Sequence, residues 1–159
     1  MTDQFQQDLR NIAKLGRFVT EYASKKFPAI EFPWSVGNCL FATDGVWLVW
    51  LKSEIKMLPV GTSPPVEQTI DPVLKLSETD WKKFTLDNVA CESCGDEVVD
   101  VDDACDACKV SVLGKPFSLK RVNAIAETFD VQGVAIVSET TLAFRLKDGY
   151  AVLCGLIGV

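Results

Sequence analysis

The stretch "CLFATDGVWLVWL", residues 39 to 51, decides the fold class. Its two apolar runs are separated by Asp44-Gly45, and glycine accepts the positive φ angle that a two-residue hairpin turn requires. The runs are therefore predicted to form paired antiparallel strands. Trp47 and Trp50 lie three residues apart, so on a strand they face opposite sides, and at least one is expected in the core.

The residues before this hairpin predict a helix followed by one more strand. Residues 3–27 read as a helix that ends before Pro28, and residues 29–36 as a strand that Pro33 confines to a sheet edge. Gly37-Asn38 is a turn signal between that strand and the hairpin. One apolar stripe of the helix is expected to face the core. It consists of Phe5, Leu9, Ile12, Leu15, Val19 and Tyr22.

The same order of elements returns toward the C-terminus. A helix is predicted over residues 117–129, and Leu119, Val122, Ala126 and Phe129 are expected on its buried side. Three strands are predicted after it, over 131–137, 141–146 and 150–157. The sequence leaves open whether this is a true internal repeat or two unrelated β-meanders.

The predicted fold class is α+β, with two αβββ halves and a small inserted module. The halves cover residues 1–62 and 115–159. Between them, residues 63–84 are proline-rich with no clear period and are predicted to be a linker. Residues 85–114 are predicted to be a zinc-ribbon insertion.

The insertion contains two Cys-x-x-Cys pairs, Cys91/Cys94 and Cys105/Cys108. Each pair lets two thiolates reach one ion, and two pairs complete a tetrahedron, which Zn²⁺ accepts without strain or redox chemistry. One structural Zn²⁺ is the expected cofactor, because nothing else in the chain suggests the electron transfer that an iron site serves. Four sulfur ligands leave no open position for water, so this zinc is not expected to be catalytic. The alternatives are four buried unpaired cysteines or a redox dithiol.

The hairpin is strongly acidic. Its acids are Glu92, Asp96, Glu97, Asp100, Asp102, Asp103 and Asp106. A ribbon that binds phosphates would carry lysine and arginine instead. The acids therefore indicate either contact with a basic protein surface or a hairpin kept soluble by its charge.

A mixed aromatic and basic segment, Trp81-Lys82-Lys83-Phe84, precedes the insertion and is the candidate partner-binding region. A helix cap at Ser77 or Thr79 followed by solvated lysines is the simpler explanation of this segment. Lys115, Lys120 and Arg121 form a second basic cluster. Cys39 and Cys154 lie in apolar runs and are expected to be inert core residues.

The composition excludes several classes of protein. The chain has 159 residues, 48% of them hydrophobic, which allows a sizeable core. It contains no histidine, so Ser-His-Asp and Cys-His catalysis in their usual forms are excluded, and no enzyme activity is expected. No apolar run is long enough to cross a membrane, and the N-terminus is unlike a secretory signal, so a cytoplasmic location is expected. The net charge of −6 disfavours a nucleic-acid partner.

The phrase Ala42-Thr43-Asp44-Gly45 and the order of elements in residues 109–159 resemble bacterial DNA sliding clamps, which are built from repeated βαβββ units. The resemblance implies a clamp-like sheet-and-helix domain. The chain departs from the family in having Val46-Trp47-Leu48 where an arginine-bearing segment is usual, and in its acidic total. No ring, DNA passage or partner groove is carried over, because a fold does not fix a function.

These features predict a non-catalytic, zinc-containing binding or adaptor protein that acts through protein–protein contacts, within a phage or bacterial DNA-processing assembly. The alternative is a nucleic-acid-binding zinc-ribbon protein with one basic face, formed by Lys82, Lys83, Lys115, Lys120 and Arg121. An enzyme that uses carboxylates alone is a third, less favoured hypothesis. The oligomeric state is left open.

Overall fold

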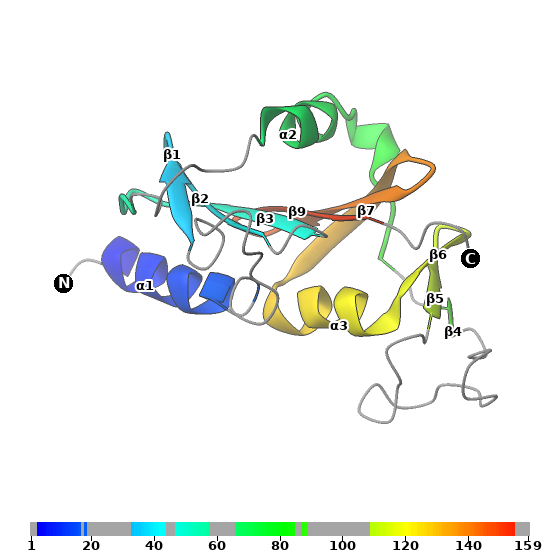
Figure 1. Cartoon of the computed structure of the whole chain (residues 1–159), viewed down its shortest axis with the longest axis horizontal. Coiled ribbons are helices and arrows are strands. Elements are labelled where there is room, and N and C mark those ends of the chain that lie inside the picture. Colours follow the sequence, from blue (N-terminus) through cyan, green and yellow to red (C-terminus); the bar gives the residue numbers. More distant parts are fainter. Residues whose placement is uncertain are drawn as a thin grey trace, which may run out of the picture. The chain divides into compact units, whose positions relative to one another are not determined.

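The computed structural model describes residues 3–16, 18, 33–43, 47–57, 66–84, 87–88 and 109–154 (Figure 1). Helices and antiparallel sheets occur together, which confirms the predicted α+β class. The chain divides into two compact units, which are described separately. Unit 1 comprises Met1–Asp71 and Asp148–Val152, and unit 2 comprises Pro72–Lys147 and Leu153–Val159. These limits differ from the predicted boundaries at residues 62, 84 and 114.

In the described part of unit 1, helix α1 (Asp3–Gly16) lies against a β-meander. Strands β1 (Trp34–Val36), β2 (Cys39–Thr43) and β3 (Trp47–Lys52) pair antiparallel, and the first residues of β9 (Gly149–Cys154) follow β3 in the sheet order. β1 takes the edge position that its preceding proline predicted. The predicted hairpin is thereby confirmed in its two strands, while the Asp44-Gly45 turn lies outside the described residues.

A row of aromatic rings crosses this sheet. Trp34 stands opposite Phe41 and Phe41 opposite Trp50, with ring centroids 5.8 and 6.2 Å apart. Tyr150 on β9 extends the row, at 5.6 Å from Trp50. Trp47, on the other face, packs edge-on against Phe18 and donates its indole N–H to the Phe18 carbonyl at 3.1 Å. Both tryptophans of β3 are therefore buried, as predicted for at least one of them.

The close approach of β9 to β3 requires a glycine. An ideal Cβ built on Gly149 would lie 2.9 Å from the Cα of Leu51 and would overlap the carbonyl oxygen of Trp50. The same crossing is fixed by a hydrogen bond from the Lys52 amide to the Asp148 carbonyl, 2.8 Å long. Glycine is therefore present because the neighbouring backbone leaves no room for a side chain.

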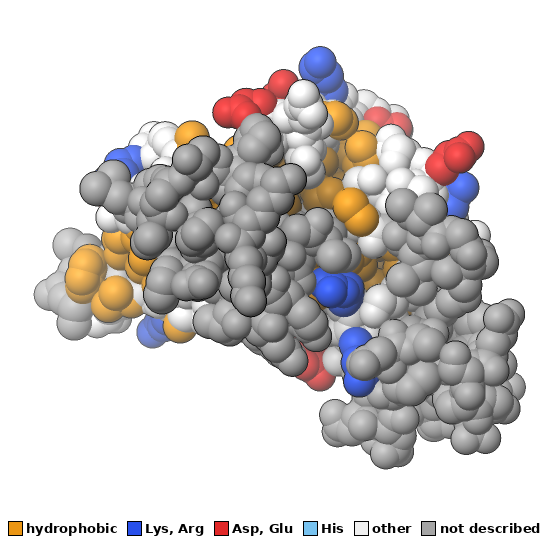
Figure 2. All heavy atoms as spheres, in the orientation of Figure 1, with side chains coloured by type: hydrophobic (Ala, Val, Ile, Leu, Met, Phe, Trp, Pro, Cys, Tyr) orange, Lys and Arg blue, Asp and Glu red, His pale blue; other side chains and the backbone are white. Residues whose placement is uncertain are grey.

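Helix α1 (Asp3–Gly16) differs from the prediction in length and in orientation. It ends at Gly16, where the helix was predicted to continue to residue 27; residues 19–32 lie outside the described part. Its buried side carries Asp8, Asn11 and Leu15, whereas Phe5 and Leu9 are 42% and 46% exposed. Figure 2 shows apolar side chains at the surface where Figure 1 places α1.

The buried polar side chains of α1 have hydrogen-bonding partners one turn away. The Gln4 amide donates to the Asp8 carboxylate at 2.9 Å, and the Gln7 amide donates to the Asn11 oxygen at 3.0 Å. These hydrogen bonds offset the free-energy cost of burying polar side chains. The expected inward stripe is therefore wrong at Phe5 and Leu9, because the helix packs through a neighbouring face.

The described part of the predicted linker, residues 66–84, has helical structure. It contains helix α2 (Glu67–Leu74) and the 3-10 helix η2 (Glu78–Asp80). Val66, Ile70 and Val73 recur at helical spacing, and Val66 and Val73 are buried. This apolar stripe stabilises α2 in spite of Pro72, which removes one backbone hydrogen bond.

The described part of unit 2 includes a three-stranded sheet, a helix and a hairpin. Strands β4 (Asp87–Asn88), β5 (Lys109–Val112) and β6 (Lys115–Ser118) form the sheet. Helix α3 (Leu119–Thr128) follows β6 directly, and β7 (Val131–Ser138) pairs antiparallel with β8 (Thr141–Leu146). The predicted helix and both hairpin strands are confirmed, whereas β6 is an element that the sequence did not predict.

Candidate functional site

The four cysteines of the predicted metal centre, Cys91, Cys94, Cys105 and Cys108, lie outside the described residues. Among the residues that the structure does describe, no group of histidine, cysteine, aspartate or glutamate side chains could hold a metal ion. Residues 89–108, which contain these cysteines, are called the cysteine segment. The strands on either side of it are described, and they show how its two ends are held.

The two ends of the cysteine segment are joined by an antiparallel ladder. Asp87 is the register partner of Ser111, and Asn88 is the partner of Val110. The chain therefore leaves β4 after Asn88 and enters β5 at Lys109, at neighbouring positions of one ladder. β5 pairs with β4 on one edge and with β6 on the other.

β5, the strand that follows the cysteine segment, belongs to the core of unit 2. Val110 and Val112 of β5 are fully buried, and Val110 stands opposite Phe117, which is 1% exposed. Helix α3 contacts β5 and β6, and Ser118 at the end of β6 caps it by accepting the Arg121 amide N–H at 3.4 Å. β5 is thus held by its pairing with β6 and its contact with α3. The cysteine segment joins β5 at the N-terminal end of this strand.

The candidate partner-binding segment, Trp81 to Phe84, lies along β7. The Lys82 amide donates to the Val134 carbonyl at 2.7 Å, and the Val134 amide donates to the Lys82 carbonyl at 2.9 Å. Trp81 packs close to Gly133, with its Cβ 3.7 Å from the position that a Cβ on that glycine would take. The segment is therefore held as a short extra strand against β7.

Its two aromatic side chains are used in packing. The guanidinium carbon of Arg145 lies 5.2 Å from the ring centroid of Trp81, and the ring of Phe84 meets Phe144 edge-on at 5.9 Å. Both aromatics are half-buried. By contrast, the side chains of Lys82 and Lys83 are exposed, and the Lys82 ammonium donates to the Thr79 carbonyl at 2.9 Å.

Arg145 connects this segment to η2. Its Nη1 donates to both carboxylate oxygens of Glu78, at 2.9 and 3.0 Å, while its guanidinium covers Trp81. The Ser77 amide donates to the Asp80 carboxylate at 2.8 Å and closes the turn, so Ser77, one of the two residues predicted as the cap, is the N-cap of η2. Sequence reasoning missed Arg145 and Glu78, because they are 67 residues apart and nothing local pairs them.

The remaining candidate residues are placed as follows. Lys120 is exposed, and Lys115 and Arg121 are half-buried; all three belong to unit 2 together with Lys82 and Lys83. Cys39 and Cys154 lie on β2 and β9, as expected from their apolar runs. The expectation that both are core residues is wrong, because Cys39 is half-buried and Cys154 is exposed.

The chain matches no protein-family model, no curated protein and no solved structure. No helix among the described residues is long and apolar enough to cross a membrane.

Proposed function

We propose that this protein is a non-catalytic binding or adaptor protein whose acidic hairpin is folded by one structural Zn²⁺. Cys91, Cys94, Cys105 and Cys108 would supply four thiolates. Four sulfur ligands fill the coordination shell, so the ion would serve folding and not the activation of water. The β4–β5 ladder is the observation that carries this proposal.

The β4–β5 ladder supports the proposal that Cys91 and Cys108 can bind the same ion. Register partners in an antiparallel pair have Cα atoms about 4.5–5.5 Å apart. Cys91 follows Asn88 by three residues and Cys108 precedes Val110 by two, which allows spans of at most roughly 11 and 7 Å. Both thiolates can therefore reach one ion with Zn–S distances of about 2.3 Å.

The charge pattern supports a protein partner. Four thiolates and one Zn²⁺ carry a net −2, and the seven acids of the hairpin add to it. A basic protein surface is the complementary partner, and its attraction would weaken with salt. The exposed lysines Lys82 and Lys83, on the segment beside β7, form a second charged surface of unit 2.

A pull-down with the intact protein tests the adaptor proposal, with mass spectrometry of what binds. The matched variant carries Cys91→Ser and Cys94→Ser, which removes half of the proposed ligands but keeps the acids. We expect partners to be lost with this variant and retained with Lys82→Ala/Lys83→Ala. Identical partners for the cysteine variant and the intact protein would show that the hairpin is not the contact.

A second candidate function is direct nucleic-acid binding, which the exposed side chains of Lys82, Lys83 and Lys120 favour. A mobility-shift titration of labelled DNA and RNA at about 50 mM and 200 mM salt separates the two functions, because phosphate contacts weaken steeply over that range. A shift that salt abolishes, and that Lys82→Ala/Lys83→Ala reduces, would favour this candidate. No shift at low salt would remove it.

A further inference from the structure

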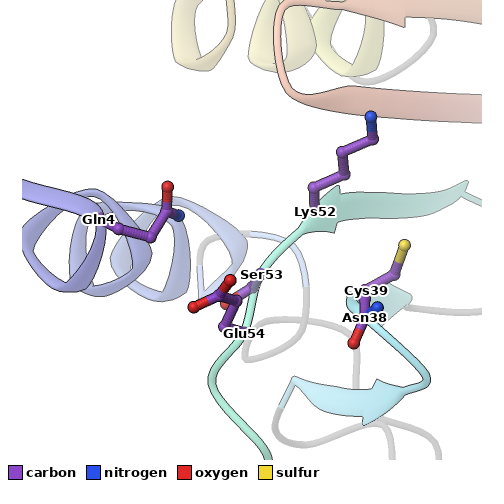
Figure 3. A pocket seen from close by; sticks show the side chains of 6 residues that line it. All are labelled: Gln4, Asn38, Cys39, Lys52, Ser53 and Glu54. Atoms are coloured by element: carbon purple, nitrogen blue, oxygen red, sulfur yellow. The ribbon is translucent and has the colours of Figure 1, made fainter.

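Unit 1 contains a pocket at the end of the meander, on the side where α1 begins (Figure 3). Its volume is about 410 Å³, within the range of roughly 300–1,000 Å³ that is usual for small-molecule sites. The residues that line it come from the start of α1, the turn before β2 and the end of β3. They are Gln4, Asn38, Cys39, Lys52, Ser53 and Glu54.

The backbone of the pocket is fixed at Ser53. This residue is 4% exposed, its amide donates to the Asn38 carbonyl at 2.9 Å, and its hydroxyl accepts the Ile55 amide at 3.2 Å. Lys52 is the register partner of Cys39 across the sheet. The polar lining is therefore carried by a rigid sheet end, as a pre-formed binding site requires.

Two amides of the pocket are oriented by partners outside it. The Gln4 nitrogen donates to the Asp8 carboxylate, which only accepts, so the Gln4 oxygen is the end left for a ligand. The Asn38 oxygen accepts the Lys56 ammonium at 3.3 Å, which only donates, so the Asn38 nitrogen is left. Gln4 thus offers an acceptor and Asn38 a donor.

The charged side chains of the pocket also comprise one donor, Lys52, and one acceptor, Glu54. The side chains of Lys52 and Glu54 make no hydrogen bond or ion pair within the described part of the chain. In Figure 3, Gln4 and Glu54 lie to the left of Ser53, and Lys52, Cys39 and Asn38 lie to its right. In this view the acceptors Gln4 and Glu54 therefore lie on one side and the Lys52 ammonium on the other, while Asn38 lies below Lys52 and Cys39.

Cys39 belongs to the donor side. Burial raises the pKa of its thiol, and the nearby charges of Lys52 and Lys56 lower it by less. The thiol is therefore protonated at neutral pH and can donate a weak hydrogen bond.

We propose that this pocket binds a short zwitterion of dipeptide size. Its ammonium would lie against the Gln4 oxygen and the Glu54 carboxylate, and its carboxylate against the Lys52 ammonium. A single anion or cation would satisfy only one side of the pocket and leave the opposite charge unpaired. Since both ionic side chains are exposed, each pair contributes modestly, and an affinity of about 1 mM is expected.

The test is a ¹⁵N-HSQC titration of the full-length, zinc-loaded protein with Ala-Ala, N-acetyl-Ala-Ala and Ala-Ala amide. We expect saturable shifts at residues 38–39 and 52–54 with Ala-Ala, and binding about 1.5- to 5-fold weaker for each blocked analogue. Glu54→Gln should weaken Ala-Ala and leave N-acetyl-Ala-Ala unchanged, because that analogue has no ammonium. Lys52→Gln should weaken Ala-Ala and leave Ala-Ala amide unchanged.

Glu67→Gln and Lys75→Gln are the matched controls, since both side chains are exposed and neither lines the pocket. Unchanged spectral dispersion confirms that each variant is folded. No saturable shift at tens of millimolar Ala-Ala would overturn the proposal, as would equal binding of all three ligands.

Discussion

Arg145 on β8 covers the ring of Trp81, with its guanidinium carbon 5.2 Å from the ring centroid, and it pairs with both carboxylate oxygens of Glu78. This one side chain joins η2 and the segment 81–84 to the β7–β8 hairpin. The aromatic part of the segment that the sequence offered as a partner-binding site is thereby used to hold the segment in place.

Removing this link should loosen the segment. Arg145→Ala is expected to lower the free energy of unfolding by about 1–2 kcal/mol, from the lost cation–π contact and buried aliphatic stem. Glu78→Gln should cost under about 0.5 kcal/mol, because the Glu78 side chain is 87% exposed and water screens the pair. Urea denaturation measures both, and hydrogen exchange at the Lys82 amide reports the local effect. Equal losses for the two variants would assign the stabilisation to the ion pair instead.

Gly149→Ala should be strongly destabilising. The added Cβ would overlap the carbonyl oxygen of Trp50, so β3 and β9 would have to separate. We expect a loss of about 2–4 kcal/mol in urea denaturation. Gly16→Ala is the control, since a Cβ there meets nothing within 4 Å, and it should be neutral or slightly stabilising. A Gly149→Ala protein as stable as the control would contradict this crossing.

The turn between β5 and β6 has an unfavourable residue. Leu113 has a φ of 52° and Gly114 a φ of 79°, as in a hairpin turn of type I′. Leucine is disfavoured in this conformation by roughly 1–2 kcal/mol, whereas asparagine tolerates it. Leu113→Asn should therefore raise the free energy of unfolding by about 1 kcal/mol. The same substitution at Leu74, which is exposed in α2, should not raise the free energy of unfolding. If Leu74→Asn stabilised the protein and Leu113→Asn did not, the turn conformation could not be the cause.

The two cysteines outside the acidic hairpin should differ in reactivity. Burial raises the pKa of the Cys39 thiol, so at pH 8 it holds less of the reactive thiolate than an ordinary cysteine. Cys154 is exposed. In peptide mapping after brief iodoacetamide treatment at pH 8, Cys39 should be alkylated several-fold more slowly than Cys154, and the difference should disappear in denaturant. Faster labelling of Cys39 in the native protein would show an accessible, activated thiol.

Local patterns predicted the elements whose signals lie within a few residues. Strands β2 and β3 follow from two apolar runs around Asp44-Gly45, and α3 follows from the spacing of Leu119, Val122 and Phe129. The orientation of α1 could not be obtained in this way. Its apolar stripe indicates a helix, but Gln4 and Gln7 allow Asp8 and Asn11 to be buried instead.

Local patterns also failed to predict most of the structure around the candidate site. Helix α2 was missed because the prolines around it obscured the stripe of Val66, Ile70 and Val73. The pairing of Asn88 with Val110 depends on partners distant in sequence, as does the contact of Arg145 with Glu78. Strand β6 was missed although only two residues separate it from its partner β5, because the predicted helix begins at residue 117, inside the strand. The pocket of unit 1 gave no signal either, because its lining residues come from three separate segments.

Elemental analysis of freshly purified, fully reduced protein tests the central claim most directly. We predict about one zinc per chain, and a large loss of it in the Cys91→Ser/Cys94→Ser variant with Cys39→Ser as the matched control that retains it. Neither zinc nor iron in the intact protein would contradict the four-cysteine metal centre.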